Sequence, residues 1–139
     1  MAVLRAGFFR EGNEDADPAM YSESLVEAVN RPAMPDEEQV LSYLKGGVEF
    51  FSTMGAEKDA LTGDEYIGGA GSLRTDGTWV WPVDLEHYIR RHHAVIPDDF
   101  HAHIRTHNHR APAVSDDRVN EIADEWFPPR PTPWANRNA

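Results

Sequence analysis

The stretch 66–93 constrains the fold of this 139-residue chain more than any other. Two segments of alternating apolar residues flank Thr-Asp-Gly-Thr at 75–78, and Asp-Gly at the centre of a short loop favours the positive φ angles of a tight primed turn. The outgoing strand ends at Pro82, which lacks a backbone N–H but suits the first turn of a helix. The sequence therefore predicts a β-hairpin over 66–81 that leads directly into a helix over 83–93.

Further elements follow from apolar periodicity and from helix start signals. Serine or proline followed by acidic residues marks the expected helix starts. The segment 48–54 is ambiguous between a strand and a short helix, and its Val and Phe residues before a glycine favour a strand. We interpret 56–65 as a polar connection. The other expected elements are a strand over 2–9, a loop over 11–18, and helices over 24–29, 35–45, 97–107 and 115–126.

These elements predict an α+β fold with a small, mainly antiparallel sheet around the central hairpin, covered by several helices. Residues 1–127 are expected to form a single globular domain, and residues 128–139 a proline-rich C-terminal tail. The absence of cysteine excludes disulfides and cysteine-ligated metal sites. No run approaches the roughly 18 to 20 apolar residues that span a bilayer. We therefore expect a cytoplasmic protein with no membrane partner.

The net charge of −11 argues against direct nucleic acid binding, because a phosphate backbone is bound by basic surface. The charge is concentrated near the N-terminus, where residues 11–38 contain nine acidic residues and one basic residue. A surface of this sign suits a basic protein partner, and a solvated face that keeps the protein soluble is the alternative. The candidate binding residues on it are Glu14, Asp15, Glu37 and Glu38.

All seven histidines lie in the segment 87–109. His103 and His107 are four residues apart on a predicted helix, so they share a face and could chelate one zinc or nickel ion. His87 precedes His92 by five residues, but no H-E-x-x-H motif completes either pair. Two alternatives stay open: the histidines have no metal role, or they have only an adventitious affinity for metal. If all seven histidines protonate as the pH falls through about 6.5, the charge rises from −11 to −4, so acid sensing is also open.

Aromatic residues offer a further candidate site. Trp79 and Trp81 alternate on one strand, so they point to the same face, and with Tyr88 they could line a ligand groove. Core packing is the alternative that we favour. Asp76 before a glycine is explained by turn chemistry, and Asp84 by its place at a helix start. No serine lies in a G-x-S-x-G elbow, so no catalytic residue is assigned.

The pattern T-D-G-x-W-x-W-P-x-D-L-x-x-Y at 75–88, preceded by Ile-Gly-Gly at 67–69 and followed by His93, Pro97 and Phe100, resembles a group of small actinobacterial proteins. The resemblance covers roughly residues 40 to 110 and implies no activity and no catalytic residues. Acidic single-domain proteins of this build also resemble the immunity proteins that neutralise polymorphic toxins.

The leading hypothesis is a non-enzymatic, acidic protein-binding module, an immunity or inhibitor type of protein that acts on a basic partner. The alternative is a metal-binding enzyme, or a metal or pH sensor, built on the histidine segment 87–109. A small-molecule pocket near Trp79, Trp81 and Tyr88 is a third possibility.

Overall fold

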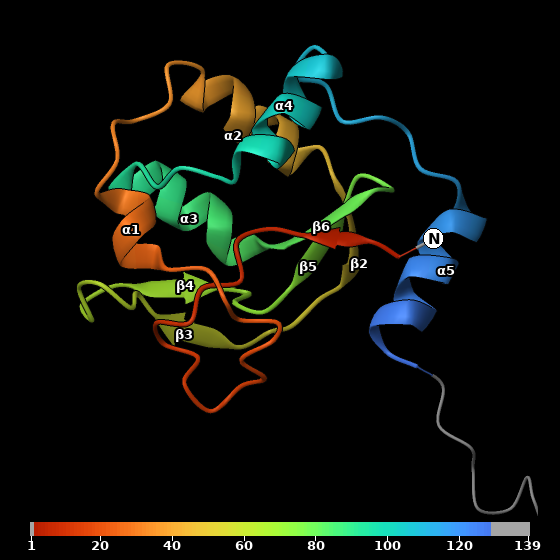
Figure 1. Cartoon of the computed structure of the whole chain (residues 1–139). Helices are drawn as coiled ribbons and strands as arrows, with labels where there is room; N and C mark the ends of the chain where they lie inside the picture. The colour runs from red at the N-terminus through yellow and green to blue at the C-terminus, as the bar shows by residue number, and fades with distance from the viewer. Residues whose placement is uncertain (1, 129–139) are drawn as a thin grey trace, which may run out of the picture.

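The predicted hairpin forms the centre of the main sheet in the computed structural model, which describes residues 2–128 (Figure 1). Strand β5 (Leu73–Thr75) pairs antiparallel with β6 (Trp79–Pro82). Strand β6 is followed at once by helix α3 (Val83–His92). The prediction of a hairpin that leads directly into a helix is therefore confirmed.

The main sheet has four strands in the order β1-β6-β5-β2. Strand β1 (Leu4–Arg5) runs parallel to β6, and β2 (Val48–Phe51) runs antiparallel to β5. A second sheet consists of β3 (Ala56–Lys58) and β4 (Tyr66–Gly68), which are antiparallel. Within residues 2–128 there are five helices and six strands in mainly antiparallel sheets, so the predicted α+β class is confirmed.

The remaining helices begin close to the predicted start signals. The side-chain oxygens of Ser24 and Ser115 accept backbone N–H groups at the starts of the first and last of these helices. Their bounds are Leu25–Val29 for α1, Glu37–Lys45 for α2, Asp98–Thr106 for α4 and Asp116–Trp126 for α5.

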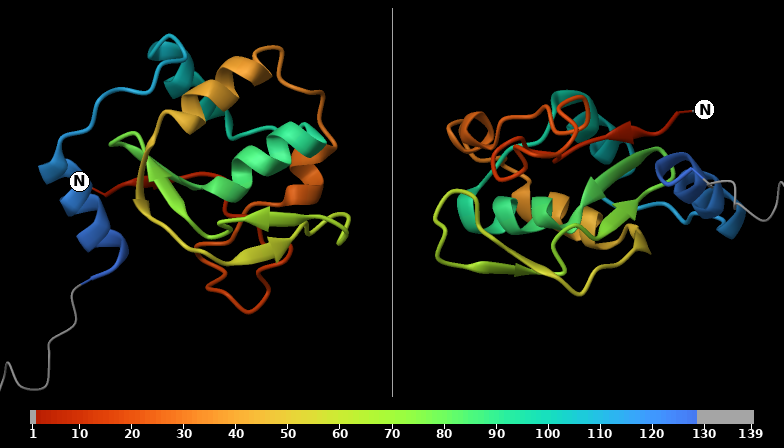
Figure 2. Two further views of the ribbon diagram at one scale, coloured as in Figure 1. Left: turned by 180° about the vertical axis from the view of Figure 1, so that it is seen from behind. Right: turned by 90° about the horizontal axis from the view of Figure 1, so that it is seen from below.

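The two faces of the main sheet support two clusters of buried residues, because side chains alternate along β6. Trp79 and Trp81 belong to the larger cluster, to which α2, α3 and α4 contribute. Val80 belongs to a smaller cluster with Phe8 and with Ile122 of α5. Helix α5 therefore packs against the sheet face opposite to the other helices, and Figures 1 and 2 show it apart from them.

The turn of the hairpin differs from the predicted primed turn. Strand pairing ends with Thr75 opposite Val80, which leaves four residues in the loop. Gly77 has a positive φ of 97°, but Asp76 does not have a positive φ. The reason is that the carboxylate of Asp76 accepts the backbone N–H groups of Thr78 and Trp79, at 2.9 and 2.7 Å, and this wraps the loop around the side chain.

The segment 66–75 that enters the hairpin forms two separate strands, β4 and β5. Between β4 and β5 the chain turns, with the backbone N–H of Ser72 donating to the carbonyl of Gly69 at 3.0 Å. This turn sends β4 away from the main sheet to pair with β3. The interpretation of 56–65 as a polar connection is therefore wrong for its first three residues, which form β3.

The N-terminal strand is much shorter than the predicted 2–9. It ends before Gly7, whose φ of 83° is incompatible with an extended strand. A Cβ at Gly7 would lie 2.9 Å from the Leu85 side chain, so this position also allows close approach to α3. After Gly7, Phe8 and Phe9 belong to the two different clusters of buried residues.

In the part of the chain that the structure describes, no helix has the length and apolar character needed to cross a bilayer. Of the predicted tail 128–139, residues 129–139 lie outside the described residues.

Candidate functional site

The first component of the candidate site is Asp59, which follows β3 directly. Its backbone N–H donates to the carbonyl of Glu65 at 2.8 Å, and its carbonyl accepts the N–H of Gly63 at 2.8 Å. Its side-chain Oδ1 accepts the N–H groups of Leu61 and Thr62 at 2.8 and 3.1 Å. The loop between β3 and β4 therefore fixes the orientation of this carboxylate and leaves Oδ2 for other partners.

Two histidines of α3 provide those partners. The Nε2 atoms of His87 and His92 each lie 2.7 Å from Oδ2 of Asp59. Their rings are nearly perpendicular, with centroids 6.3 Å apart. The side chains of Asp59 and His87 are 0 % and 5 % exposed, and that of His92 is 14 % exposed. Tyr88 strengthens the attachment of the loop to α3, because its hydroxyl accepts the N–H of Ala60 at 2.9 Å.

The surroundings of Asp59 stabilise its ionised form. Burial by itself would raise the pKa of this carboxyl group, but the hydrogen bonds from His87 and His92 and from the backbone of Leu61 and Thr62 outweigh it. The pKa of Asp59 therefore lies well below its ordinary value. A carboxylate that stays ionised can act either as a hydrogen-bond acceptor for two imidazoles or as a metal ligand.

One oxygen of Asp59 and one nitrogen each of His87 and His92 lie within 4.8 Å of one another. Carboxylate oxygen and imidazole nitrogen are common ligands of zinc and other divalent transition metals. These three residues could therefore hold a metal ion.

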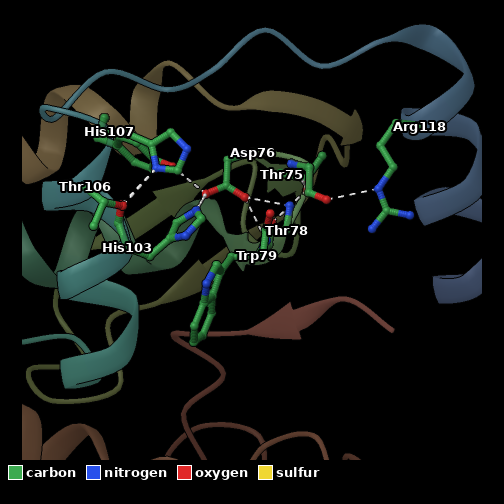
Figure 3. A network of polar contacts seen from close by, with 10 residues as sticks. Thr75, Asp76, Thr78, Trp79, His103, Thr106, His107 and Arg118 are labelled. Atoms are coloured by element: carbon green, nitrogen blue, oxygen red, sulfur yellow. Dashed lines mark hydrogen bonds and ion pairs between the residues drawn. The ribbon is translucent and has the colours of Figure 1, made fainter. Parts of the chain in front are cut away.

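The histidine pair that the sequence favours, His103 and His107, lies elsewhere. The rings are side by side as their spacing predicts, with centroids 4.5 Å apart (Figure 3). Nε2 of His103 contacts Oδ2 of Asp76 at 3.0 Å, and Nδ1 of His107 contacts the carbonyl of His103 at 2.9 Å. Within residues 2–128, no third ligand completes a metal-binding group with this pair.

Asp76 is the centre of a second polar network, between the hairpin and α2. In addition to His103 and the two loop N–H groups, its carboxylate accepts the hydroxyl of Tyr43 at 2.5 Å. Burial, together with the neighbouring carboxylate, raises the pKa of Tyr43 far above its ordinary value. Asp76 therefore does more than form a turn, because it also ties α2 and α4 to the hairpin.

Asp36 is the centre of a third network, at the start of α2. Its carboxylate contacts Nε2 of His101 at 2.8 Å, Nε2 of His109 at 2.7 Å and Nε of Arg105 at 3.4 Å. His93 pairs in a similar way with Glu37, at 3.0 Å. Six of the seven histidines thus contact a carboxylate, and the pairs are His87 and His92 with Asp59, His93 with Glu37, His101 and His109 with Asp36, and His103 with Asp76.

The predicted aromatic site is part of the core. Trp79, Trp81 and Tyr88 are 4 %, 0 % and 5 % exposed. The ring of Trp79 stacks on Phe100 with centroids 4.7 Å apart. The two tryptophans therefore pack in the core, which is the favoured alternative.

The four acidic residues proposed as a binding surface are divided between two places. Glu14 and Asp15 are exposed on the loop between β1 and α1, whereas Glu37 and Glu38 lie in the first turn of α2. Figures 1 and 2 show this loop and the start of α2 at opposite ends of the molecule. Together these residues do not form one continuous surface, and the protein-binding module stays a prediction.

Sequence reasoning missed Asp59 because it lies in a segment interpreted as a connection. A signal was present in Asp-Ala-Leu-Thr-Gly at 59–63, since an aspartate with a glycine four residues later is typical of a side-chain-stabilised turn. That signal does not identify His87 and His92 as partners. Comparison with models of protein families, with curated proteins and with solved structures gives no match.

Proposed function

We propose that this protein binds one divalent transition-metal ion, zinc or nickel, through Asp59, His87 and His92. The observation that carries the proposal is the convergence of one carboxylate oxygen and two imidazole nitrogens within 4.8 Å of one another. It is a specific form of the alternative that the histidine segment suggests, with Asp59 added and with His87 and His92 in place of His103 and His107.

The surroundings of the three residues favour metal binding. The N–H groups of Leu61 and Thr62 orient the carboxylate of Asp59 through the oxygen that a metal would not use. Hydrogen bonds of this kind, from outside the ligand set, commonly raise metal affinity by 10- to 100-fold. Burial of Asp59 and His87 also limits competition from water for the ligand atoms.

Metal binding requires a small movement. Each imidazole nitrogen lies 2.7 Å from the Asp59 oxygen, the distance of a hydrogen bond with a shared proton, whereas ligands at about 2.0 to 2.1 Å around a tetrahedral ion are about 3.3 Å apart. His92 is best placed to move, since it is the last residue of α3 and the most exposed of the three. The ion replaces these protons, so its affinity should fall in acid.

Three protein ligands leave at least one coordination position for water or a bound molecule. Catalytic metal sites have this pattern, whereas structural zinc sites usually have four protein ligands. His87 also lines a cavity of about 360 Å³ together with Ser72 and Glu65. This arrangement supports a metal-dependent enzyme or a metal sensor over a purely structural site.

The test uses untagged protein treated with chelator and then titrated with Zn²⁺ or Ni²⁺ by calorimetry and by chemical denaturation. We expect one ion per chain, and a stabilisation of about 2.7 kcal/mol when free metal is 100 times Kd. His92→Gln keeps a donor for Asp59 but removes the imidazole ligand. It should therefore retain the fold and weaken metal binding at least about 100-fold.

Two controls separate this site from a general affinity of histidines for metal. His101→Gln removes another imidazole that contacts a carboxylate, and the double change of His103 and His107 to Gln removes the pair favoured by sequence. Both variants should bind metal like the wild type. Binding that is lost in these controls but kept in His92→Gln, or no binding by the wild type, would refute the proposal.

A further inference from the structure

A second site is a small cavity that Tyr88 also lines. It has a volume of about 140 Å³ and lies between the segment after β1, the connection from β4 to β5 and the start of α3. Four aromatic side chains line it, Phe8, Phe9, Tyr21 and Tyr88. Two pairs of these rings meet edge to face, Phe8 with Tyr21 at 5.5 Å and Phe9 with Tyr88 at 5.8 Å between centroids.

The charged residues that line this cavity all have one sign. They are Glu11, Glu57 and Asp84, and no lysine, arginine or histidine is among the lining residues. The carboxylate of Glu11 is already occupied, because it accepts the N–H groups of Leu25 and Val26 at the start of α1, at 2.8 and 3.1 Å. Glu57 and Asp84 are the carboxylates left to act on a ligand.

Asp84 is held in position but only partly neutralised. Within residues 2–128 its side chain accepts one hydrogen bond, from the N–H of Gly71 at 3.0 Å. Burial, with a contribution from the negative charge of Glu57, raises the pKa of Asp84 above its ordinary value despite that bond. Burial and the charge of Asp84 likewise raise the pKa of Tyr21. The cavity therefore has a negative potential that no basic side chain among its lining residues compensates.

We infer that this cavity binds a small organic cation, such as an alkylammonium or quaternary ammonium group, with its charge beside Asp84 and Glu57 and its alkyl groups against the aromatic rings. Aromatic faces attract cations, and the attraction grows when water is excluded. The volume equals the share of about five water molecules in the liquid, which suits a ligand of a few heavy atoms. Calcium or magnesium fits less well, since such ions need six or more oxygen ligands and the aromatic rings supply none.

Choline and its uncharged isostere 3,3-dimethylbutan-1-ol provide a direct test, because they share a shape and differ in charge. The readout is the amide resonance of Gly71 in a ¹H–¹⁵N titration, since this N–H donates to Asp84. We expect choline to shift this resonance saturably, and the neutral isostere to bind at least about tenfold more weakly, a difference of about 1.4 kcal/mol.

Asp84→Asn keeps the shape of the side chain and an oxygen for Gly71 but removes the charge. The matched control is Asp117→Asn, which removes an exposed aspartate at the same position, the second residue, of α5. Asp84→Asn should weaken choline binding at least about tenfold relative to Asp117→Asn. Equal binding of choline and its isostere, equal binding by the two variants, or a response to Ca²⁺ but not to choline would each overturn the proposal.

Discussion

Replacing Asp36 by asparagine tests how strongly the contacts between carboxylates and histidines stabilise the fold. Asp36 is at the N-cap position of α2, but its side chain does not cap the helix. It contacts His101, Arg105 and His109 instead, all from α4 or the residues just after it. An amide of the same shape can keep some of these contacts, but it loses the negative charge.

The size of the expected destabilisation follows from the pKa of the Asp36 carboxyl group. Burial would raise this pKa, but the hydrogen bonds from His109 and His101 lower it from 3.8 to about 2. A difference of this size between unfolded and folded protein corresponds to at most about 2.5 kcal/mol. The network touches solvent, with the Arg105 side chain 54 % exposed. Because solvent screens the charges, we expect Asp36→Asn to lower the free energy of unfolding by about 1 to 2 kcal/mol at pH 7.

The direction of this pKa shift determines how the stabilisation by Asp36 depends on pH. Since the folded pKa lies below the unfolded one, the contribution of Asp36 is fully present above about pH 5 and is lost as the pH falls towards 2. Urea denaturation of wild type and variant at several pH values measures this directly. The difference in unfolding free energy should be about 1 to 2 kcal/mol at pH 7 and should approach zero near pH 2.

Glu38→Gln is the matched control, because Glu38 is an exposed acid in the first turn of the same helix. Loss of the Glu38 charge should remove only its interaction with the helix dipole and so lower the free energy of unfolding by about 0.3 to 1 kcal/mol. The reasoning fails if Asp36→Asn destabilises no more than Glu38→Gln, or if its effect does not change between pH 7 and pH 2.

Two further substitutions test the core. Tyr43→Phe removes the hydroxyl that donates to Asp76. It should lower the free energy of unfolding, measured by urea denaturation, by about 1.5 to 3 kcal/mol, the range for a hydrogen bond to a charged group. A decrease below about 0.5 kcal/mol would contradict this prediction. Gly47→Ala places a Cβ 2.5 Å from the Trp81 ring and 3.2 Å from the carbonyl of Thr75, and should lower the free energy of unfolding by about 1 to 3 kcal/mol. Gly55→Ala is its control and should be nearly neutral, because no atom of residues 2–128 lies within 4 Å of the added Cβ. Equal effects of the two changes would refute the overpacking argument.

Local sequence signals predicted the elements whose determinants are local. The hairpin, the helix after Pro82 and the starts of α1 and α5 each depend on residues within a few positions of one another. The failures have tertiary causes. The short N-terminal strand reflects the close approach of Gly7 to Leu85, and β3 forms in the predicted connection because it pairs with β4.

The candidate site could be predicted only in part, for a related reason. Seven histidines in one segment indicated that polar chemistry is concentrated there. Helical spacing predicts that His103 and His107 lie on one face of the helix, but it cannot predict which residue contacts each imidazole. Asp59 is separated from His87 by 28 positions and from His92 by 33. Only the packing of the loop between β3 and β4 on α3 brings them together.

The acid-rich segment near the N-terminus and the histidine-rich segment bind each other in the folded chain, through Asp36 with His101 and His109 and through Glu37 with His93. This pairing bears on the metal and pH alternatives. A protonated imidazole beside a carboxylate gains an ion pair, so mild acid should not separate these segments. A metal ion, in contrast, must compete with the same protons for its imidazole ligands. Between pH 7 and 5 we therefore expect the proposed site to release its ion while the protein stays folded, as measured by metal content after dialysis and by circular dichroism. Unfolding in this range would instead favour a pH switch, because it would show that protonation itself disrupts the pairing.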